Sequence, residues 1–260
     1  MTKKYLAFGY DTERPYGALA LSEEGREFRK GQIGFVRRMN AMFDEKDVPR
    51  TYFLLGNYLE SCLLDFDKGC LRTIYNKENP LIEIQQHTYS HPIIRPIKGR
   101  LDKHVFTPKQ FGMDVKMAAE LINEILGVQT FGLRTPIGYH QDLSDKPQIL
   151  EELRNHGIKY VSSHLRSERT LEGPLTKDRQ PHDYNNIMFP ELIEIPSHGW
   201  QDVVFTKEKA KIFLEREPDG PEEIIHHYSK LFSKANDIDL PIVTIALAFT
   251  HGLLWSMMPI

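Results

Sequence analysis

Short apolar runs, rich in β-branched and aromatic residues, recur along the chain between longer stretches of mixed polarity. Runs of this length and composition are typical of buried strands. The predicted strands are 5–10, 51–55, 81–86, 129–133, 159–162, 192–195 and 242–249.

Between these runs, apolar residues return at helical spacing, and the predicted helices are 31–46, 108–126, 146–156 and 221–234. The helix at 108–126 has clear end signals: Thr107 as N-cap, Pro108 at the first helical position and Gly127 as the stop. Alternating strands and helices predict an α/β fold with a mostly parallel sheet. The pattern does not decide between a nearly closed (β/α) barrel and an open doubly wound sheet.

No repeat or low-complexity linker interrupts the pattern, so residues 1–260 are predicted to form a single domain. The polar stretch 168–190 is expected to be a long loop over the active face. A net charge of −3 argues against nucleic acid as a partner. The most apolar segment, 240–249, is about half the length of a membrane span, so no transmembrane segment is expected.

Cysteine usage and the N-terminus predict a cytoplasmic location. Cys62 and Cys70 are expected in one helical stretch, where eight residues separate them by too much for a disulfide. Few cysteines fit a reducing compartment. The start, Met1-Thr2-Lys3-Lys4, leads into a short apolar run that does not resemble a signal peptide.

Candidate metal ligands follow two of the predicted strands. His87 and His91 lie four residues apart directly after 81–86, and Asp11 and Glu13 follow 5–10. Because the carboxyl ends of parallel strands meet at one edge, these side chains are expected to converge. Two imidazoles and a carboxylate can hold one metal ion and leave a spare carboxylate as base, which is the outline of a hydrolytic site. Taken alone, Asp11 and Glu13 also fit a capping aspartate and a solvated Glu–Arg pair.

Further candidates follow later strands. Pro136 makes the turn after 129–133 rigid, so that Arg134 can orient a carboxylate and a backbone N–H can face an oxyanion. Arg134 also fits a structural salt bridge. His251, at the end of the last strand, fits either a catalytic acid or a buried structural histidine, and Trp200 fits either stacking on a sugar ring or a core position.

A serine–histidine nucleophile is an alternative source of chemistry. Ser162-Ser163-His164 and Ser197-His198 supply the residue types. The chain lacks the G-x-S-x-G elbow at these positions, and a metal site explains more of the clusters.

Read in order, these clusters resemble the polysaccharide deacetylase family, also called carbohydrate esterase family 4, with its NodB-type domain. His87-Thr88-Tyr89-Ser90-His91 is similar to the second family motif, which carries two metal-ligand histidines, and Arg134-Thr135-Pro136-Ile137-Gly138 is similar to the third. Asp11-Thr12-Glu13 resembles the first motif, with Glu13 where the family usually has Asp, and His251 stands in the place of the fifth-motif histidine. Ser162 and Ser163 stand where the fourth motif has an Asp that tunes this histidine, so His251 is expected to be less basic.

The resemblance implies a distorted (β/α) barrel with about seven mostly parallel strands. It implies a carbohydrate N-deacetylase that removes an N-acyl group, such as acetyl, from an amino-sugar-containing substrate. Glu13, His87 and His91 would bind a divalent transition metal, with zinc ahead of cobalt, iron and nickel.

The resemblance also implies a role for each remaining candidate. Asp11 would act as base, Arg134 would orient it, and His251 would protonate the leaving amine. The Ile137 N–H, beside Pro136, would bind the oxyanion. A homo-oligomer is compatible with the sequence.

Two other functions stay open for the same fold. One is a metal-independent hydrolase of a cyclic amide or ureide, as in allantoinase-like relatives. The other is a catalytically inactive saccharide-binding protein, suggested by the missing fourth-motif Asp.

Overall fold

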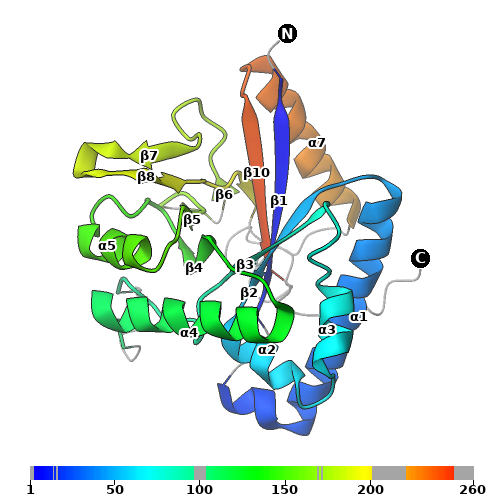
Figure 1. Cartoon of the computed structure of the whole chain (residues 1–260). Helices are drawn as coiled ribbons and strands as arrows, with labels where there is room; N and C mark the ends of the chain where they lie inside the picture. Colours follow the sequence, from blue (N-terminus) through cyan, green and yellow to red (C-terminus); the bar gives the residue numbers. More distant parts are fainter. Residues whose placement is uncertain are drawn as a thin grey trace.

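The computed structural model describes residues 3–13, 15, 17–96, 104–168, 170, 172–200 and 221–248. Its centre is an eight-stranded sheet with the strand order β10-β1-β2-β3-β4-β5-β8-β7 (Figure 1). The strands of this sheet are β1 (Tyr5–Thr12), β2 (Arg50–Leu54), β3 (Ile82–Gln86), β4 (Gly132–Tyr139), β5 (Tyr160–His164), β7 (His182–Tyr184), β8 (Phe189–Glu194) and β10 (Ile242–Ala248). A separate antiparallel pair joins β6 (Glu172–Gly173) to β9 (Gly199–Trp200).

Every predicted strand is present, and together they are the parallel members of the sheet. Only β7 runs antiparallel, against β8. The largest boundary difference is at β4, which continues past the predicted turn to Tyr139. It does so through an irregularity in its register with β5 between Arg134 and Tyr139, which accommodates Pro136.

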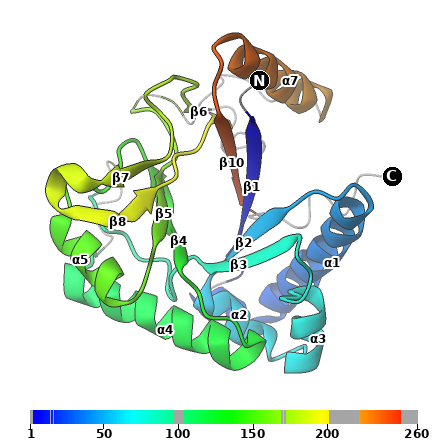
Figure 2. The same cartoon turned by 45° about the horizontal axis from the view of Figure 1, so that its top comes forward.

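The sheet curves into a distorted, incomplete barrel (Figure 2). Residues 195–198 lie between its two sides. The Ser197 N–H donates to the His164 carbonyl at 3.0 Å, and the next N–H, of His198, donates to the Thr244 carbonyl of β10 at 2.8 Å. One segment thus hydrogen-bonds to β5 and to β10 without forming a strand, so in the described residues the curved sheet is bridged at this point and is not closed by strand pairing.

Helices pack against the outer face of the sheet (Figures 1 and 2). They are α1 (Glu23–Glu45), α2 (Gly56–Cys62), α3 (Lys68–Ile74), α4 (Pro108–Leu126), α5 (Pro147–Asn155) and α7 (Pro221–Asp237), with short 3₁₀ turns η1 (Gly17–Leu21) and η2 (Asn185–Ile187). The bounds of α4 agree with the prediction because its end signals are local. Thr107 and Gln110 form a reciprocal capping box, and Gly127 ends the helix at φ 71°.

Two sequence predictions about local structure are wrong. Cys62 and Cys70 lie in different helices, α2 and α3, because Asp67 caps a new helix between them; both thiols are free. The stretch 168–190 is not a loop throughout, since it contains β6, β7, η2 and the start of β8. Its polar residues occupy short strands with one exposed face, which the hydrophobic pattern does not separate from a loop.

The apolar core lies between the helices and the outer face of the sheet. One cluster packs α1, α2 and α3 against β2 and β3, and a second packs α4 and α5 against β4, β5 and β8. Polar residues lie elsewhere on the strands: the Thr51 hydroxyl and the Tyr160 hydroxyl both donate to Glu83, at 2.6 and 3.2 Å. In the part of the chain that the structure describes, no helix is long and apolar enough to cross a membrane.

An ion pair ties β7 to the loop after β4. His182 Nε2 lies 2.9 Å from Asp142 Oδ2, and its Nδ1 lies 2.9 Å from the Gln180 carbonyl, so both ring nitrogens face acceptors. The hydrogen bond that His182 donates to Asp142 raises the pKa of His182 to about 9, although burial opposes it. Burial favours a higher pKa for Asp142, but the hydrogen bonds from His182 and Ser144 and the charge of His182 together outweigh it, and the pKa falls to about 2.

This pair predicts a measurable titration. His182 should titrate near pH 9 in an NMR experiment, and Asp142→Asn should return its midpoint toward about 6.5. The contribution of His182 to the free energy of unfolding is full below the unfolded-state pKa of His182 and is lost as the pH rises through about 9. The contribution of Asp142 is lost as the pH falls through about 2. A wild-type midpoint near 6.5 would contradict the pair.

Candidate active site

Two acidic side chains of the candidate site lie at the carboxyl end of β1. Asp11 lies within the strand, paired with Phe53 of β2 and Ala248 of β10, and Glu13 follows directly after it. The spacing of two residues puts both carboxylates on one face, as expected for extended backbone. Both residues are buried, with exposures of 8% and 7%, which argues against a solvated Glu–Arg pair.

Glu13, His87 and His91 form a compact group of metal-ligand atoms, all within 4.8 Å of one another. Glu13 Oε2 lies 3.3 Å from His87 Nε2 and 2.8 Å from His91 Nε2. His87 Nδ1 lies 2.9 Å from the Arg134 carbonyl, so this nitrogen donates and Nε2 is left toward Glu13. One carboxylate and two imidazoles suit zinc and neighbouring transition metals, so the residues fit a metal centre.

The electrostatics of the group favour a charged Glu13. Burial on its own raises the pKa of the Glu13 carboxyl, but the imidazoles of His91 and His87 outweigh it and hold that pKa well below its usual range. The pKa of His87 is raised, since Asp11 and Glu13 outweigh the burial that opposes it. The pKa of Asp11 is also raised, because burial outweighs the attraction of Arg134 and His87.

The turn between the histidines has an uncommon backbone conformation. Thr88 and His91 both adopt positive φ, 68° and 60°, and neither is glycine. Such residues cost about 1–3 kcal/mol each and persist only where neighbours hold them. Part of this support comes from α2, where the N–H of Gly56 donates to the Thr88 carbonyl and that of Asn57 to the Tyr89 carbonyl, both at 2.9 Å.

Arg134 is the side chain that reaches across the barrel to Asp11. Its Nη1 donates to Asp11 Oδ1 at 2.9 Å and to the Gly9 carbonyl at 3.0 Å, and its guanidinium lies 4.2 Å from the Phe53 ring centre. Gly9 is required here, because a Cβ at this position would overlap the Arg134 guanidinium and crowd the Phe53 ring. Sequence reasoning did not single out Gly9, although a glycine inside a strand is a signal of close approach.

The predicted oxyanion segment lies in the irregular part of β4. Ile137 has φ 60°, a strained conformation for a β-branched residue, and it follows Pro136 directly. The next carbonyl, of Gly138, accepts a hydrogen bond from Arg166 Nε at 2.8 Å. The segment is therefore held in a fixed shape, while the oxyanion role of Ile137 and Pro136 stays a prediction.

One predicted site residue within the described part of the chain, Trp200, is not gathered with this group. The Trp200 ring stacks on His227 of α7 at 3.8 Å with an interplanar angle of 12°, and its carbonyl accepts from the Tyr228 hydroxyl. These contacts place it against α7, and its sugar-stacking role stays a prediction. His251 lies outside the described residues.

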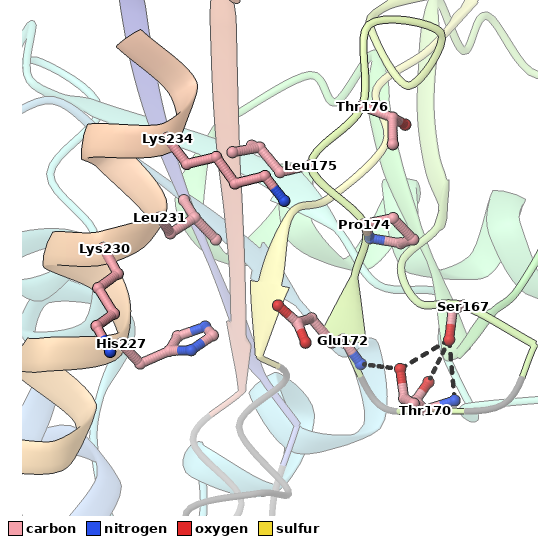
Figure 3. A pocket seen from close by; sticks show the side chains of 10 residues that line it. All are labelled: Ser167, Thr170, Glu172, Pro174, Leu175, Thr176, His227, Lys230, Leu231 and Lys234. Atoms are coloured by element: carbon pink, nitrogen blue, oxygen red, sulfur yellow. Dashed lines mark hydrogen bonds between the residues drawn. The ribbon is translucent and has the colours of Figure 1, made fainter. Parts of the chain in front are cut away.

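His227, on which Trp200 stacks, lines a hollow between α7 and the residues Ser167, Thr170, Glu172 and 174–176 (Figure 3). Glu172, which pairs with Trp200 across β6 and β9, faces Lys234 there. Burial raises the pKa of Glu172, with Lys234 opposing it. Of the predicted site residues that the structure describes, none lines this hollow.

The serine–histidine alternative does not form a dyad in the described part of the chain. The Ser163 hydroxyl donates to Glu194 at 2.7 Å. His198 Nε2 lies 2.8 Å from the Arg179 carbonyl and its Nδ1 accepts from the Thr244 N–H, so both of its nitrogens are engaged. His164 contacts Arg179, and burial together with that cation lowers its pKa to about 4.

A parallel barrel that gathers a carboxylate, two histidines and an Arg–Asp pair at its strand ends has the layout of a hydrolase site. The model of the family described as polysaccharide deacetylase matches residues 28–162. The chain belongs to the polysaccharide deacetylase family, and its enzyme class is that of a carbohydrate deacetylase hydrolase. The matched residues include His87, His91 and Arg134, whereas Asp11 and Glu13 lie before them.

Solved structures show the same fold. A Mycobacterium smegmatis protein described as a polysaccharide deacetylase is 18% identical, with a TM-score of 0.59 over 95% of this chain and 77% of that one. A Pseudomonas aeruginosa protein with the same description is 14% identical, with a TM-score of 0.55 over 94% and 77% of the two chains. The 4-α-glucanotransferase of Thermococcus litoralis is 14% identical, with a TM-score of 0.54 over 95% of this chain and 33% of that one. No protein of curated function matches the chain.

The Arg134–Asp11 pair predicts a large effect of truncation on stability. Arg134→Met should lower the free energy of unfolding by about 3–5 kcal/mol, because it leaves a buried carboxylate without its partner. Urea unfolding measures this change. In an Asp11→Asn background the same substitution should cost clearly less. Equal stability of Arg134→Met and the wild type would contradict the pair.

Proposed function

We propose that the protein is a metal-dependent N-deacetylase acting on an amino-sugar-containing substrate. The observation that carries the proposal is the donor set of Glu13, His87 and His91, of which the first two are buried and the third is partly buried, beside the Arg134–Asp11 pair. When bound, a divalent metal supplies Lewis-acid activation of the amide carbonyl and of water. Zinc fits the donor set first, and cobalt, iron and nickel fit the same ligand types.

Asp11 is the proposed general base. Burial raises the pKa of Asp11, which makes this carboxylate a stronger proton acceptor than an exposed one. Arg134 opposes that shift and fixes the direction of the Oδ1 atom, so the carboxylate is held in one orientation. The raised pKa of Asp11 and its fixed orientation support Asp11, rather than Glu13, as the group that takes the proton from water.

The remaining steps are assigned by family position. The Ile137 N–H binds the developing oxyanion, with Pro136 keeping its turn rigid, and His251 protonates the leaving amine. Trp200 is proposed to stack on the sugar ring. The complete donor set favours this reaction over metal-independent hydrolysis of a cyclic amide or ureide.

The proposed substrate is an N-acylated sugar or glycoconjugate. A nucleotide-linked or lipid-linked amino sugar is the candidate that fits an enzyme working in the cytoplasm.

The proposal predicts the metal content of the protein. Purified wild type should carry about one transition metal per chain, and His87→Ala should lose it, because two protein ligands hold such an ion poorly. Elemental analysis measures the content, and acetate release from a panel of N-acetyl and N-formyl sugars measures activity. His104→Ala is the matched control, since His104 is exposed and 3.4 Å from Gln110. Metal-free wild type without acetate release on adding zinc would contradict the proposal.

The role of Asp11 predicts a second, separable loss. Asp11→Asn should lower kcat/KM by about 10²–10⁴-fold, the usual contribution of a general base, while metal content stays near that of the wild type. The two losses separate because Asp11 lies outside the group of ligand atoms formed by Glu13, His87 and His91. Activity within a few fold of wild type would rule out Asp11 as base.

A further inference from the structure

Asp114 of α4 is a buried carboxylate that none of the family motifs contains. It lies on the apolar face of the helix, three residues after Phe111 and directly before Val115, and only 6% of it is exposed. In the part of the chain that the structure describes, no lysine, arginine or histidine forms an ion pair with it. A polar residue within a buried helical stripe is the sequence signal that marks it.

Among the described residues, the hydrogen-bond partners of Asp114 all belong to the turn between the two metal-ligand histidines. Oδ1 accepts the N–H of Tyr89 at 2.7 Å and that of Ser90 at 3.1 Å. Oδ2 accepts the Ser90 hydroxyl at 2.5 Å and also lies 3.2 Å from the Ser90 N–H. Successive backbone N–H groups form a cradle for an anion, and this cradle holds a side chain of the protein itself.

The same turn is held on its other side by α2, which packs beside α4 (Figures 1 and 2). There the N–H groups of Gly56 and Asn57 bond the carbonyls of Thr88 and Tyr89. Gly56 leaves room for the turn, since a Cβ there would lie 2.7 Å from Tyr89 Cδ2. The N–H groups of Tyr89 and Ser90 therefore donate to Asp114 of α4. The carbonyls of Thr88 and Tyr89 accept from N–H groups of α2.

The two residues that flank these amides, Thr88 and His91, are the ones with positive φ. Without outside hydrogen bonds a threonine and a histidine favour other backbone regions, and a change of φ at His91 turns its imidazole away from Glu13. Tyr89 and Ser90 lie between them, so the bonds to Asp114 act directly on the segment that sets the distance between the ligands.

We propose that Asp114 is a positioning residue that holds the His87–His91 turn in its metal-binding conformation. The inference rests on the proposed metal site and adds a residue that controls the affinity of that site for metal. Asp114 acts through the backbone of Tyr89 and Ser90 and needs no contact with metal or substrate.

The test compares zinc affinity in Asp114→Ala and in a matched control. Competition with a chromophoric chelator should show about 10–100-fold weaker zinc binding by Asp114→Ala, the range typical for residues that orient metal ligands. Asp114→Asn, which keeps the size and one acceptor oxygen, should lose less. Asp65→Ala is the control, because Asp65 is similarly buried, with 6% of its side chain exposed, but pairs with Arg29. Its zinc affinity should match that of the wild type.

A second readout needs no metal. Hydrogen exchange at the amides of Tyr89 and Ser90 should quicken in Asp114→Ala and stay unchanged in Asp65→Ala. Unchanged zinc affinity or unchanged exchange in folded Asp114→Ala overturns the inference. Wild type that binds zinc but releases no acetate from any sugar overturns the proposed reaction and leaves the role of Asp114 supported by the affinity and exchange data. Wild type that binds no zinc overturns both.

Discussion

The buried contact between Arg134 and Asp11 joins β4 to β1 across the interior of the barrel, and much of the site depends on it. The Arg134 guanidinium holds the Asp11 carboxylate, while the carbonyl of the same residue accepts the hydrogen bond of His87 Nδ1. One residue thus orients the proposed base and one proposed metal ligand. Such a contact is stable only when its surroundings are complete, because either charge left alone in the interior is costly. Gly9 and the Phe53 ring supply the space and the surface for the guanidinium.

The site stores strain in two places, and both lie where chemistry is proposed. Thr88 and His91 surround the amides held by Asp114, and Ile137 lies in the irregular part of β4. In each case hydrogen bonds from outside the segment hold its backbone. They come from α4 and α2 for the first turn and from Arg166 for the second. Rigid turns on a rigid sheet hold the side chains of the site in fixed positions.

The fold was largely predictable because its signals are local. Seven apolar runs became the parallel strands, and the ends of α4 follow from Thr107, Pro108 and Gly127. The errors lie where the pattern is weak. The polar residues of β7 read as a loop, the helix break at Asp67 between the cysteines was missed, and α1 begins earlier than expected, at the Ser22 cap. Hydrophobic periodicity identifies an element that buries one face. Short exposed strands bury too few apolar side chains to produce a recognisable period.

The sequence by itself determined the order of the strands along the chain and the identity of the ligand types, since both depend on residue chemistry and spacing. It identified Asp11, Glu13, His87, His91 and Arg134 as one group, and the structure brings these residues together. Only the tertiary structure decided that the sheet curves until 195–198 bonds both sides, and that Asp114 serves the histidine turn. Both features depend on contacts between residues far apart in the chain. Neither the hydrogen bonds of 195–198 to two strands nor a buried acceptor such as Asp114 produces a local sequence pattern by which it could be recognised.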